Sequence, residues 1–408
     1  MVEYLQRLFQ AYYKGVPLAD LKPAKFNNRE FAFIIWNARG MIRHKGFFSV
    51  EDYKDFLIKK APIHVYYSAA LYNSPWKDRM DLKDYKGCDL IFDIDCDHIE
   101  TACKQEHDSW ICKDCGKKGK GPAPRECPKC SNARMKEETW LCDECLEVSK
   151  TETRKLVDDF LVPDFGLGLD ELEIYFSGHR GYHVHVEVEQ YLSLTSDERR
   201  EISDYITSTG INIENMGFFT NSQGIHGFKL EDPGWRGKLA NHLLEELENI
   251  KDETTSSIFP EKLATLLGES YPILKKRLIK GDTNWTLQGI KGGNWNRILK
   301  HLIDNTHVEI DVPVTIDVHR LIRAPSSLHG KTGFKICKLE RDELDGFDPF
   351  LDPIVFRGNE ETVKIINPTP PFRVGENAFG PYEVDEPVSL PLEAAVYLLC
   401  KKKAVVME

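Results

Sequence analysis

We predict an α/β fold in which a sheet-bearing core is interrupted by a metal-organised insert and by a mainly helical segment. Three observations carry this prediction. Alternating apolar runs are typical of strands, residues 103–145 are rich in Lys, Gly, Pro and Cys, and much of 196–305 has apolar residues at helical spacing. A chain of 408 residues with 41% hydrophobic content is long enough for about two to three folded domains.

The composition excludes several classes of protein. A net charge of −11 argues against a protein that coats nucleic acid through its overall field. The sequence has no apolar run of about 18 residues or more, and its start lacks the basic-then-apolar order of a secretory signal. We therefore expect a soluble, intracellular, cytoplasmic protein with no membrane contact. In that compartment the 11 cysteines, six of them in C-x-x-C pairs, indicate metal ligation rather than disulfides.

The first 60 residues predict a helix and then a turn-rich connector, WNARGMIRHKGFFS. Two strand-like runs follow, IHVYYSAALY at 63–72 and YKGCDLIFDID at 85–95. Because strand side chains repeat every two residues, Asp93 and Asp95 share one face of the second run, while Phe92 and Ile94 share the other.

Two carboxylates on one strand face are costly to bury unless a cation offsets their charge. A divalent metal provides that offset, since ions such as Mg²⁺ prefer oxygen ligands and keep positions for substrate phosphates. The alternative is an exposed sheet face with solvated carboxylates, and the D-x-D spacing alone does not decide between the two. Asp97 has the spacing of a helix capping box with Glu100, so we assign it a structural role.

Eight potential zinc ligands lie between 103 and 145, enough for two tetrahedral structural sites. We predict a nested arrangement. An inner zinc ribbon is formed by Cys112, Cys115, Cys127 and Cys130, and an outer site is formed by Cys103, His107, Cys142 and Cys145. The competing arrangement pairs the second and third C-x-x-C motifs and leaves one knuckle open.

A helix around 156–161 and the clearest hairpin in the chain, ELEIYFSGHRGYHVHVEVE at 171–189, come next. The SGHRG turn offers Ser177, Arg180, backbone amides and His179, a set that can cradle a phosphate. The alternative is a glycine-rich turn without a ligand. His183 lies on the polar face of the returning strand, where it either supports such a site or is structural.

After the helical segment, HVEIDVPV at 307–314 predicts a strand with Glu309 and Asp311 on one face, a source for a third metal-binding carboxylate. Asp317 competes for that role, but its place before VHRLI favours a helix N-cap. RLIRAPSSLHGKTG at 320–333 predicts a basic loop that can clamp a triphosphate. A final helix is predicted over 393–403.

Taken in order, FDID, the cysteine insert, SGHRGYHVHV, EIDVPV and RLIRAPSSLHGKTG resemble the catalytic small subunit of archaeal and eukaryotic DNA primases. The resemblance spans residues 1 to about 340. It implies a Mg²⁺- or Mn²⁺-dependent nucleotidyltransferase that starts RNA chains, and in archaea DNA chains, on single-stranded template. In such an enzyme, three aspartates hold two metals that activate the 3′-hydroxyl and stabilise the pyrophosphate leaving group.

The resemblance also assigns residues. The metal carboxylates are Asp93, Asp95 and Asp311, the last because it lies eighteen residues before the histidine of SLHGKTG. The positions that match binding of the incoming nucleotide are Ser177, Arg180, His183, Arg323, His329 and Lys331. The family's single zinc knuckle matches the outer cysteine site, so residues 112–130 are an extra ribbon inserted within it.

The fold implied is an α/β, mixed-sheet catalytic core with an inserted helical subdomain and a zinc-binding module. We expect the core at 1–100, 151–192 and 306–408, the zinc insert at 101–150 and the helical subdomain at 193–305. The implied partners are an iron–sulfur large subunit in a heterodimer, single-stranded DNA and nucleoside triphosphates. Two other functions remain as alternatives to that of a primase catalytic subunit. One is a gap-filling or repair polymerase of the same superfamily, and the other is a non-catalytic zinc-bearing nucleic-acid adaptor.

Overall fold

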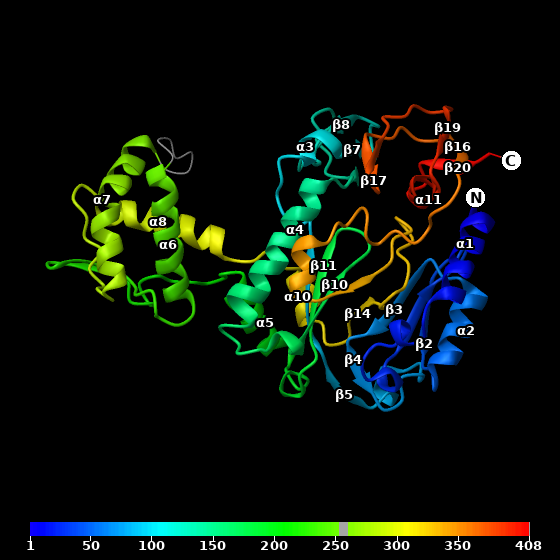
Figure 1. The fold of residues 1–408 in the computed structure, drawn as a ribbon, viewed down its shortest axis with the longest axis horizontal. Helices are drawn as coiled ribbons and strands as arrows, with labels where there is room; N and C mark the ends of the chain where they lie inside the picture. The colour runs from blue at the N-terminus through cyan, green and yellow to red at the C-terminus, as the bar shows by residue number, and fades with distance from the viewer. Residues whose placement is uncertain (253–259, 408) are drawn as a thin grey trace. The chain divides into compact units, whose positions relative to one another are not determined.

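The computed structural model describes residues 1–252 and 260–407 (Figure 1). The chain forms two compact units. The first comprises Met1–Arg154, Leu169–Arg200 and Glu309–Glu408, and the second comprises Lys155–Gly168 and Glu201–Val308. The predicted combination of helices and sheets is confirmed, and the strand pairs within the described residues are antiparallel. No helix in this part of the chain has the length and apolar character needed to cross a membrane.

The N-terminal part of the first unit is a four-stranded sheet with two helices. The strand order is β14-β3-β1-β2, formed by Leu321–Arg323, His64–Ser68, Phe31–Ile34 and Met41–Lys45. Helix α1 (Val2–Gly15) buries Leu5, Phe9 and Tyr13, which recur every four residues on one face. Helix α2 (Val50–Lys60) follows. The prediction of a turn-rich connector at 36–49 is wrong in part, because this segment contains strand β2.

The second sheet carries the predicted hairpin. Its order is β15-β10-β11-β6, formed by Cys337–Leu339, Leu172–Phe176, Gly181–Val186 and Leu90–Asp95. All six residues of β11 are buried, including His183 and His185 on the face predicted to be polar. The runs predicted as single strands at 63–72 and 85–95 each divide in two. β4 (Ala70–Tyr72) pairs with β5 (Tyr85–Cys88), apart from β3 and β6.

The cysteine insert is a small three-stranded sheet flanked by short and long helices. It contains α3 (Lys104–His107), β7 (Ser109–Cys112), β8 (Lys118–Lys120) and β9 (Met135–Glu138). Its buried centre consists of Trp110, Cys112 and Cys127, with Cys115 and Cys130 packed against them. Helix α4 (Asp143–Lys155) then continues over Leu156–Leu161 with π-type hydrogen bonding, so the helix predicted around 156–161 is confirmed.

The second unit is mainly helical, with α6 (Trp235–Asp252), α7 (Glu261–Ile279) and α8 (Gly292–Thr306). Its core includes the fully buried Trp285 and Trp295, whose ring centroids lie 5.2 Å apart. A hairpin of β12 (Phe219–Asn221) and β13 (Gly224–His226) was not predicted. Part of the predicted helical segment, 253–259, lies outside the described residues. Helix α5 (Ser196–Ile206) matches the prediction for SDERREISDYI.

The strand predicted at 307–314 is wrong. Val312–Ile316 forms the short helix α9, with Pro313 in its first turn. Proline has no N–H to give to a strand ladder, yet it is well accommodated at a helix start. Asp317 is also not a helix N-cap, because it follows α9 and its carboxylate accepts a hydrogen bond from the His319 amide at 2.9 Å.

The C-terminal residues pack on the core of the first unit. The three-stranded sheet β19-β16-β20 consists of Pro387–Leu390, Glu361–Ile365 and Ala404–Val406. A hairpin is formed by β17 (Phe372–Val374) and β18 (Asn377–Phe379), and α10 spans Arg341–Gly346. The helix predicted at 393–403 is confirmed as the buried α11 (Leu392–Cys400), whose Tyr397 ring lies 5.5 Å from that of Phe334. Short 3₁₀ turns lie at Ala19–Leu21, Phe26–Asn28, Met80–Leu82, Leu169–Glu171 and Glu189–Tyr191.

Candidate active site and cysteine clusters

A polar cavity of about 240 Å³ lies in the first unit where β6, β11 and β14 approach one another. Acidic side chains enter it from β6, and basic side chains enter from the SGHRG turn and from residues 320–331. Its polar lining consists of Asp93, Asp95, Ser177, His179, Arg180, His183, Arg320, Arg323, His329 and Lys331, together with Tyr66. Eight of the nine predicted metal- and nucleotide-binding residues therefore meet in one place.

Asp93 and His183 face each other across neighbouring strands. They are direct partners in the antiparallel pairing of β6 with β11, and His183 Nε2 lies 3.1 Å from Asp93 Oδ1. Burial raises the pKa of Asp93, but the histidine more than offsets it, so the net pKa lies below its ordinary value. Burial likewise opposes the charge on His183, yet Asp93 holds the pKa of that imidazole above its ordinary value. The two behave as a buried ion pair.

Asp95 is the second carboxylate of the same strand face. Its Oδ2 lies 2.9 Å from Arg180 Nη2, and its side chain is only 12% exposed. Burial and the neighbouring Asp93 raise the pKa of Asp95 to about 6, despite the opposing charge of Arg180. Two carboxylates that repel each other in a polar cavity are a fitting ligand set for a divalent cation.

Asp97 does not cap a helix, so that prediction is wrong. Residues 96–98 form a turn, and the next helix begins only at Lys104. Asp97 instead pairs with the Arg180 guanidinium from the hairpin turn. The guanidinium thus contacts both Asp95 and Asp97, which fixes it over the end of β6.

The SGHRG turn is held tightly against its surroundings. Gly178 has φ +75, and a side chain there would lie 2.9 Å from the His329 Cβ. A Cβ on Gly181 would overlap the carbonyl oxygen of Ile94 on β6. The Cys96 amide donates to the Arg180 carbonyl at 3.0 Å, which extends the strand pairing into the turn. Glycine at both positions lets the turn approach β6 and the basic loop together.

The basic segment 320–331 supplies the opposite wall. Arg323 Nη2 donates to His329 Nε2 at 3.0 Å, and its guanidinium lies 4.6 Å from the centre of the Tyr66 ring. Its Nη1 atom is buried and has no hydrogen-bond partner among the described residues. Burial and then Arg180 and Arg323 lower the pKa of Lys331. This crowding of positive charge favours an anionic ligand.

The histidines of the cavity are neutral except for His183. The rings of His179 and His329 stack at 4.7 Å with planes 9° apart. Burial lowers the pKa of both well below the ordinary value. A neutral His329 can accept from Arg323, which orients that guanidinium. The sequence reasoning did not single out Tyr66, whose only signal was its place in the strand HVYYS.

Asp311 is the predicted site residue that does not line the cavity. Its amide donates to the Asp93 carbonyl at 2.8 Å, so its backbone lies beside β6. In the described part of the chain, however, the oxygens of Asp93, Asp95 and Asp311 do not form a group within 4.8 Å of one another. A role for Asp311 as a third metal ligand remains a prediction.

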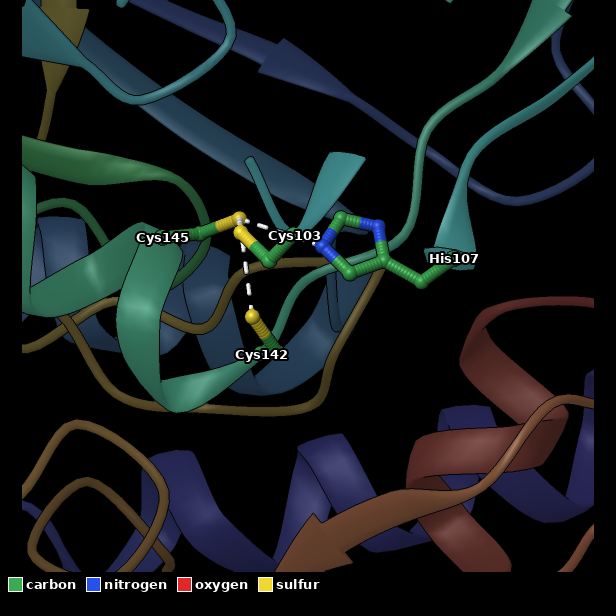
Figure 2. A group of neighbouring side chains, drawn as sticks. All are labelled: Cys103, His107, Cys142 and Cys145. Carbon is green, nitrogen blue, oxygen red and sulfur yellow. Dashed lines mark hydrogen bonds between the residues drawn. The ribbon is translucent and has the colours of Figure 1, made fainter. Parts of the chain in front are cut away.

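The cysteines and His107 gather into the two sets of the nested arrangement. The outer set is Cys103, His107, Cys142 and Cys145, whose side chains point toward one another in Figure 2. Cys145 Sγ lies 3.4 Å from Cys103 Sγ and 3.3 Å from His107 Nε2. In tetrahedral zinc, sulfurs about 2.3 Å from the metal lie about 3.8 Å apart, so these separations fit the ion. His107 Nδ1 lies 2.8 Å from Asp108, the kind of carboxylate contact that orients a histidine ligand.

The inner set is Cys112, Cys115, Cys127 and Cys130. Cys112 Sγ lies 3.6 Å from Cys130 Sγ, and Cys115 Sγ lies 3.6 Å from Cys127 Sγ. The competing pairing of the second C-x-x-C motif with the third is not the grouping found. Four sulfurs at these separations around one point suit a structural zinc with no open position.

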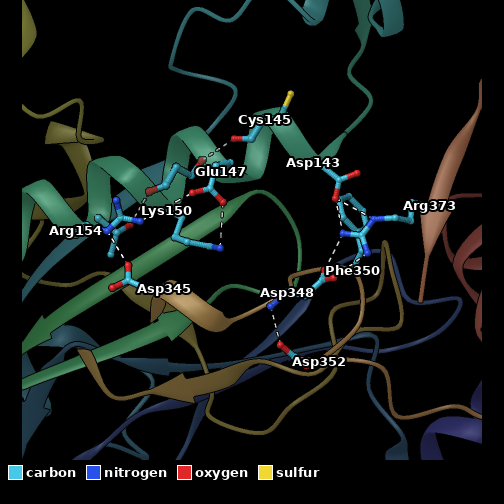
Figure 3. A network of polar contacts seen from close by, with 12 residues as sticks. Asp143, Cys145, Glu147, Lys150, Arg154, Asp345, Asp348, Phe350, Asp352 and Arg373 are labelled. Atoms are coloured by element: carbon cyan, nitrogen blue, oxygen red, sulfur yellow. Dashed lines mark hydrogen bonds and ion pairs between the residues drawn. The ribbon is translucent and has the colours of Figure 1, made fainter. Parts of the chain in front are cut away.

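Helix α4 runs from the outer set to the turn that carries Arg180, and Figure 3 shows its polar contacts with residues 345–373. It begins between Cys142 and Cys145, and one turn later Ser149 Oγ lies 3.4 Å from the Arg180 carbonyl oxygen. At its first residue Asp143 contacts Arg373, which also binds Asp348 through two contacts of 2.8 Å. The helix is therefore anchored at the cysteine end and supports the turn that carries Arg180.

A family model and three relatives bear on this site. The family model described as DNA primase small subunit matches residues 132–339. The chain is 33% identical to the DNA primase small subunit PriS of Methanothrix thermoacetophila, over 98% of this chain and 97% of the relative. It is 30% identical to the PriS of Nitrosopumilus maritimus over 99% of this chain and 98% of the relative. It is 32% identical to the PriS of Archaeoglobus fulgidus over 98% of this chain and 97% of the relative.

Proposed function

This chain belongs to the DNA primase small subunit family, and on that premise we propose that it is the catalytic subunit of a DNA primase. As a nucleotidyltransferase of this kind, it would synthesise short RNA primers de novo on single-stranded DNA, and DNA primers are a second product to be tested. The relatives carry the primase name over nearly the whole length of this chain, which favours primer synthesis over a gap-filling polymerase of the same superfamily.

The observation that carries the proposal is the composition of this cavity. Paired carboxylates on β6 face a cluster of guanidinium and ammonium groups across it. Nucleotidyl transfer needs both features, because cations at the carboxylates and basic side chains must share the charge of a triphosphate. A zinc-bearing adaptor without catalysis would need neither.

We assign Asp93, Asp95 and Asp311 as the residues that hold Mg²⁺ or Mn²⁺. When bound there, the cations neutralise developing charge on the attacking 3′-oxygen and on the pyrophosphate leaving group. The chain's own contribution is to fix the carboxylates. Strand pairing with β11 sets Asp93 opposite His183, and the Arg180 guanidinium restrains the Asp95 carboxylate.

We assign the incoming triphosphate to Ser177, Arg180, His183, Arg323, His329 and Lys331. Arg323 Nη1 has no hydrogen-bond partner among the described residues, and burial together with the nearby Arg180 and Arg323 lowers the pKa of Lys331. A polyphosphate would relieve that repulsion and accept from both groups. His329 is expected to act by orienting Arg323, since the two are already hydrogen-bonded.

The remaining assignments follow the same premise. We infer one structural zinc at each cysteine set, and a chain organised as catalytic core (1–100, 151–192 and 306–408), zinc insert (101–150) and helical subdomain (193–305). The designation as a small subunit implies a large partner subunit, which we propose is the iron–sulfur protein of a heterodimer. DNA replication also implies an intracellular protein.

The test is primer-free synthesis on single-stranded DNA, with Mg²⁺ or Mn²⁺ and with ribo- or deoxynucleotides in separate reactions. The expected result is a metal-dependent product that begins without a primer and is lost in Asp95→Asn. Asp55→Asn, an exposed aspartate of α2, is the matched control and should retain activity. Extension only from a supplied primer would instead support the gap-filling polymerase.

A further inference from the structure

Among the described residues, a third group of side chains with metal-ligating atoms lies on the second sheet, apart from the cavity lining and from both cysteine sets. Glu173 on β10 and His185 on β11 are direct cross-strand partners, and Glu187 follows His185 by two residues. One ligand atom from each lies within 4.8 Å of the others. We propose that Glu173, His185 and Glu187 bind one divalent transition-metal cation, separate from the proposed catalytic metals.

His185 is oriented as a metal-binding histidine should be. It is 1% exposed, and its Nδ1 lies 3.3 Å from the Tyr67 hydroxyl. Its Nε2 has no hydrogen-bond partner among residues 1–252 and 260–407. With the proton on Nδ1, the imidazole donates to Tyr67 and keeps the Nε2 lone pair for a cation. A buried ring nitrogen without a partner is otherwise unfavourable.

The charges around the group leave one carboxylate without a cation of its own. Lys338 lies 2.7 Å from Glu173, and Arg29 lies 2.5 Å from Asp89. Glu187 has only the same Arg29 guanidinium, at 3.9 Å, and its Oε1 accepts no hydrogen bond from a described residue. Burial, Asp89 and Glu173 raise the pKa of Glu187 to about 7. A bound cation would supply the missing positive charge.

The donor set indicates the class of metal. One imidazole nitrogen with two carboxylates suits Mn²⁺, Fe²⁺, Co²⁺ or Zn²⁺ better than Mg²⁺, which prefers oxygen donors alone. The side chains of Glu173 and Glu187 are 25% and 14% exposed, so an ion can reach the group from solvent. The proposal does not depend on primer synthesis, since none of its three ligands lines the catalytic cavity.

The experiment counts bound Mn²⁺ by equilibrium dialysis of the full chain at mildly alkaline pH, with the cysteine sites left zinc-loaded. Mn²⁺ is the probe because thiolate sites select zinc. Asp93→Asn with Asp95→Asn provides a background in which the catalytic carboxylates no longer compete. That protein should bind one Mn²⁺. Adding Glu187→Gln should abolish the binding, while adding Glu189→Gln, the same change at an exposed position, should not.

Pulsed EPR of the bound Mn²⁺ provides a readout that does not require Glu187→Gln to fold. The background protein should show nitrogen coupling from an imidazole ligand, and His185→Gln should remove it. The proposal is overturned if the background protein binds no Mn²⁺, if the ion is held without nitrogen coupling, or if folded Glu187→Gln still binds it. Any of these results would leave the primase assay, and the function proposed from it, unaffected.

Discussion

Asp95→Asn is predicted to stabilise the protein in the absence of added divalent cations while it abolishes catalysis. Asp95 is 12% exposed and shares its strand face with Asp93, and its pKa is raised from 3.8 to about 6. A carboxyl whose folded pKa lies above its unfolded value destabilises the fold once it ionises. That penalty is absent below the unfolded pKa, grows between the two values and is complete above about 6.

The magnitude follows from the displacement of the pKa. A change from 3.8 to about 6 corresponds to about 3 kcal/mol of free energy at neutral pH. Asparagine has nearly the same shape, cannot ionise and still offers an oxygen to Arg180. We therefore expect Asp95→Asn to raise the free energy of unfolding by up to about 3 kcal/mol at neutral pH and by almost nothing near pH ~4.

The assay is urea unfolding of zinc-loaded protein at both pH values, without and with Mn²⁺. Mn²⁺ should stabilise Asp95→Asn less than the wild type, because the variant keeps only the separate site at Glu173, His185 and Glu187, and primer synthesis by the variant should fall by about 100-fold or more. Asp55→Asn should match the wild type throughout. The electrostatic reasoning would be refuted if the variant were no more stable than the wild type at neutral pH. It would also be refuted if the variant gained as much stability over the wild type at low pH as at neutral pH.

Three further predictions concern the nucleotide site, the zinc ribbon and the hairpin. Arg180→Lys removes the planar fork, so the KM for nucleotide should rise about 10- to 100-fold with a smaller effect on kcat, measured by steady-state primer synthesis. Cys112→Ser should lower the zinc content from two ions per chain to one, and an unchanged content in elemental analysis would contradict the inner site. Gly181→Ala should lower soluble yield and melting temperature, because the new Cβ overlaps the Ile94 carbonyl; Gly293→Ala, with open space around it, should change neither.

The features predicted correctly from the sequence are those whose signal is local. The hairpin around SGHRG was recognisable because both strands alternate with a period of two and the turn residues lie between them. The C-x-x-C spacing places both sulfurs of a motif on one metal, and of the two arrangements that this allowed, the nested one is the grouping found. Residues 320–331 were predicted to form a basic loop because their charged residues cluster around proline and glycine. In the structure they form the basic wall of the cavity.

The predictions that failed depend on partners far away in the sequence. Asp97 has a capping-box spacing, but Arg180, 83 residues later, offers a guanidinium that the local pattern cannot reveal. Val308 and Ile310 of HVEIDVPV are buried, as its apolar alternation predicts, yet Pro313 cannot donate to a strand ladder and lies in the first turn of a helix instead. Strand β2 was missed because its residues are largely exposed and polar.

The group of Glu173, His185 and Glu187 shows why part of a site is invisible before the fold is known. In sequence these residues belong to two alternating strands, where polar residues at every second position predict a solvated face. The first sheet changes that interpretation, because Tyr67 on β3 contacts His185 and Arg29 lies beside Asp89 and Glu187. A face that water would have solvated is thereby buried, and its charges must be balanced by the protein or by an ion. Burial of this face by residues more than 100 positions away is what turns an ordinary strand pattern into a candidate metal site.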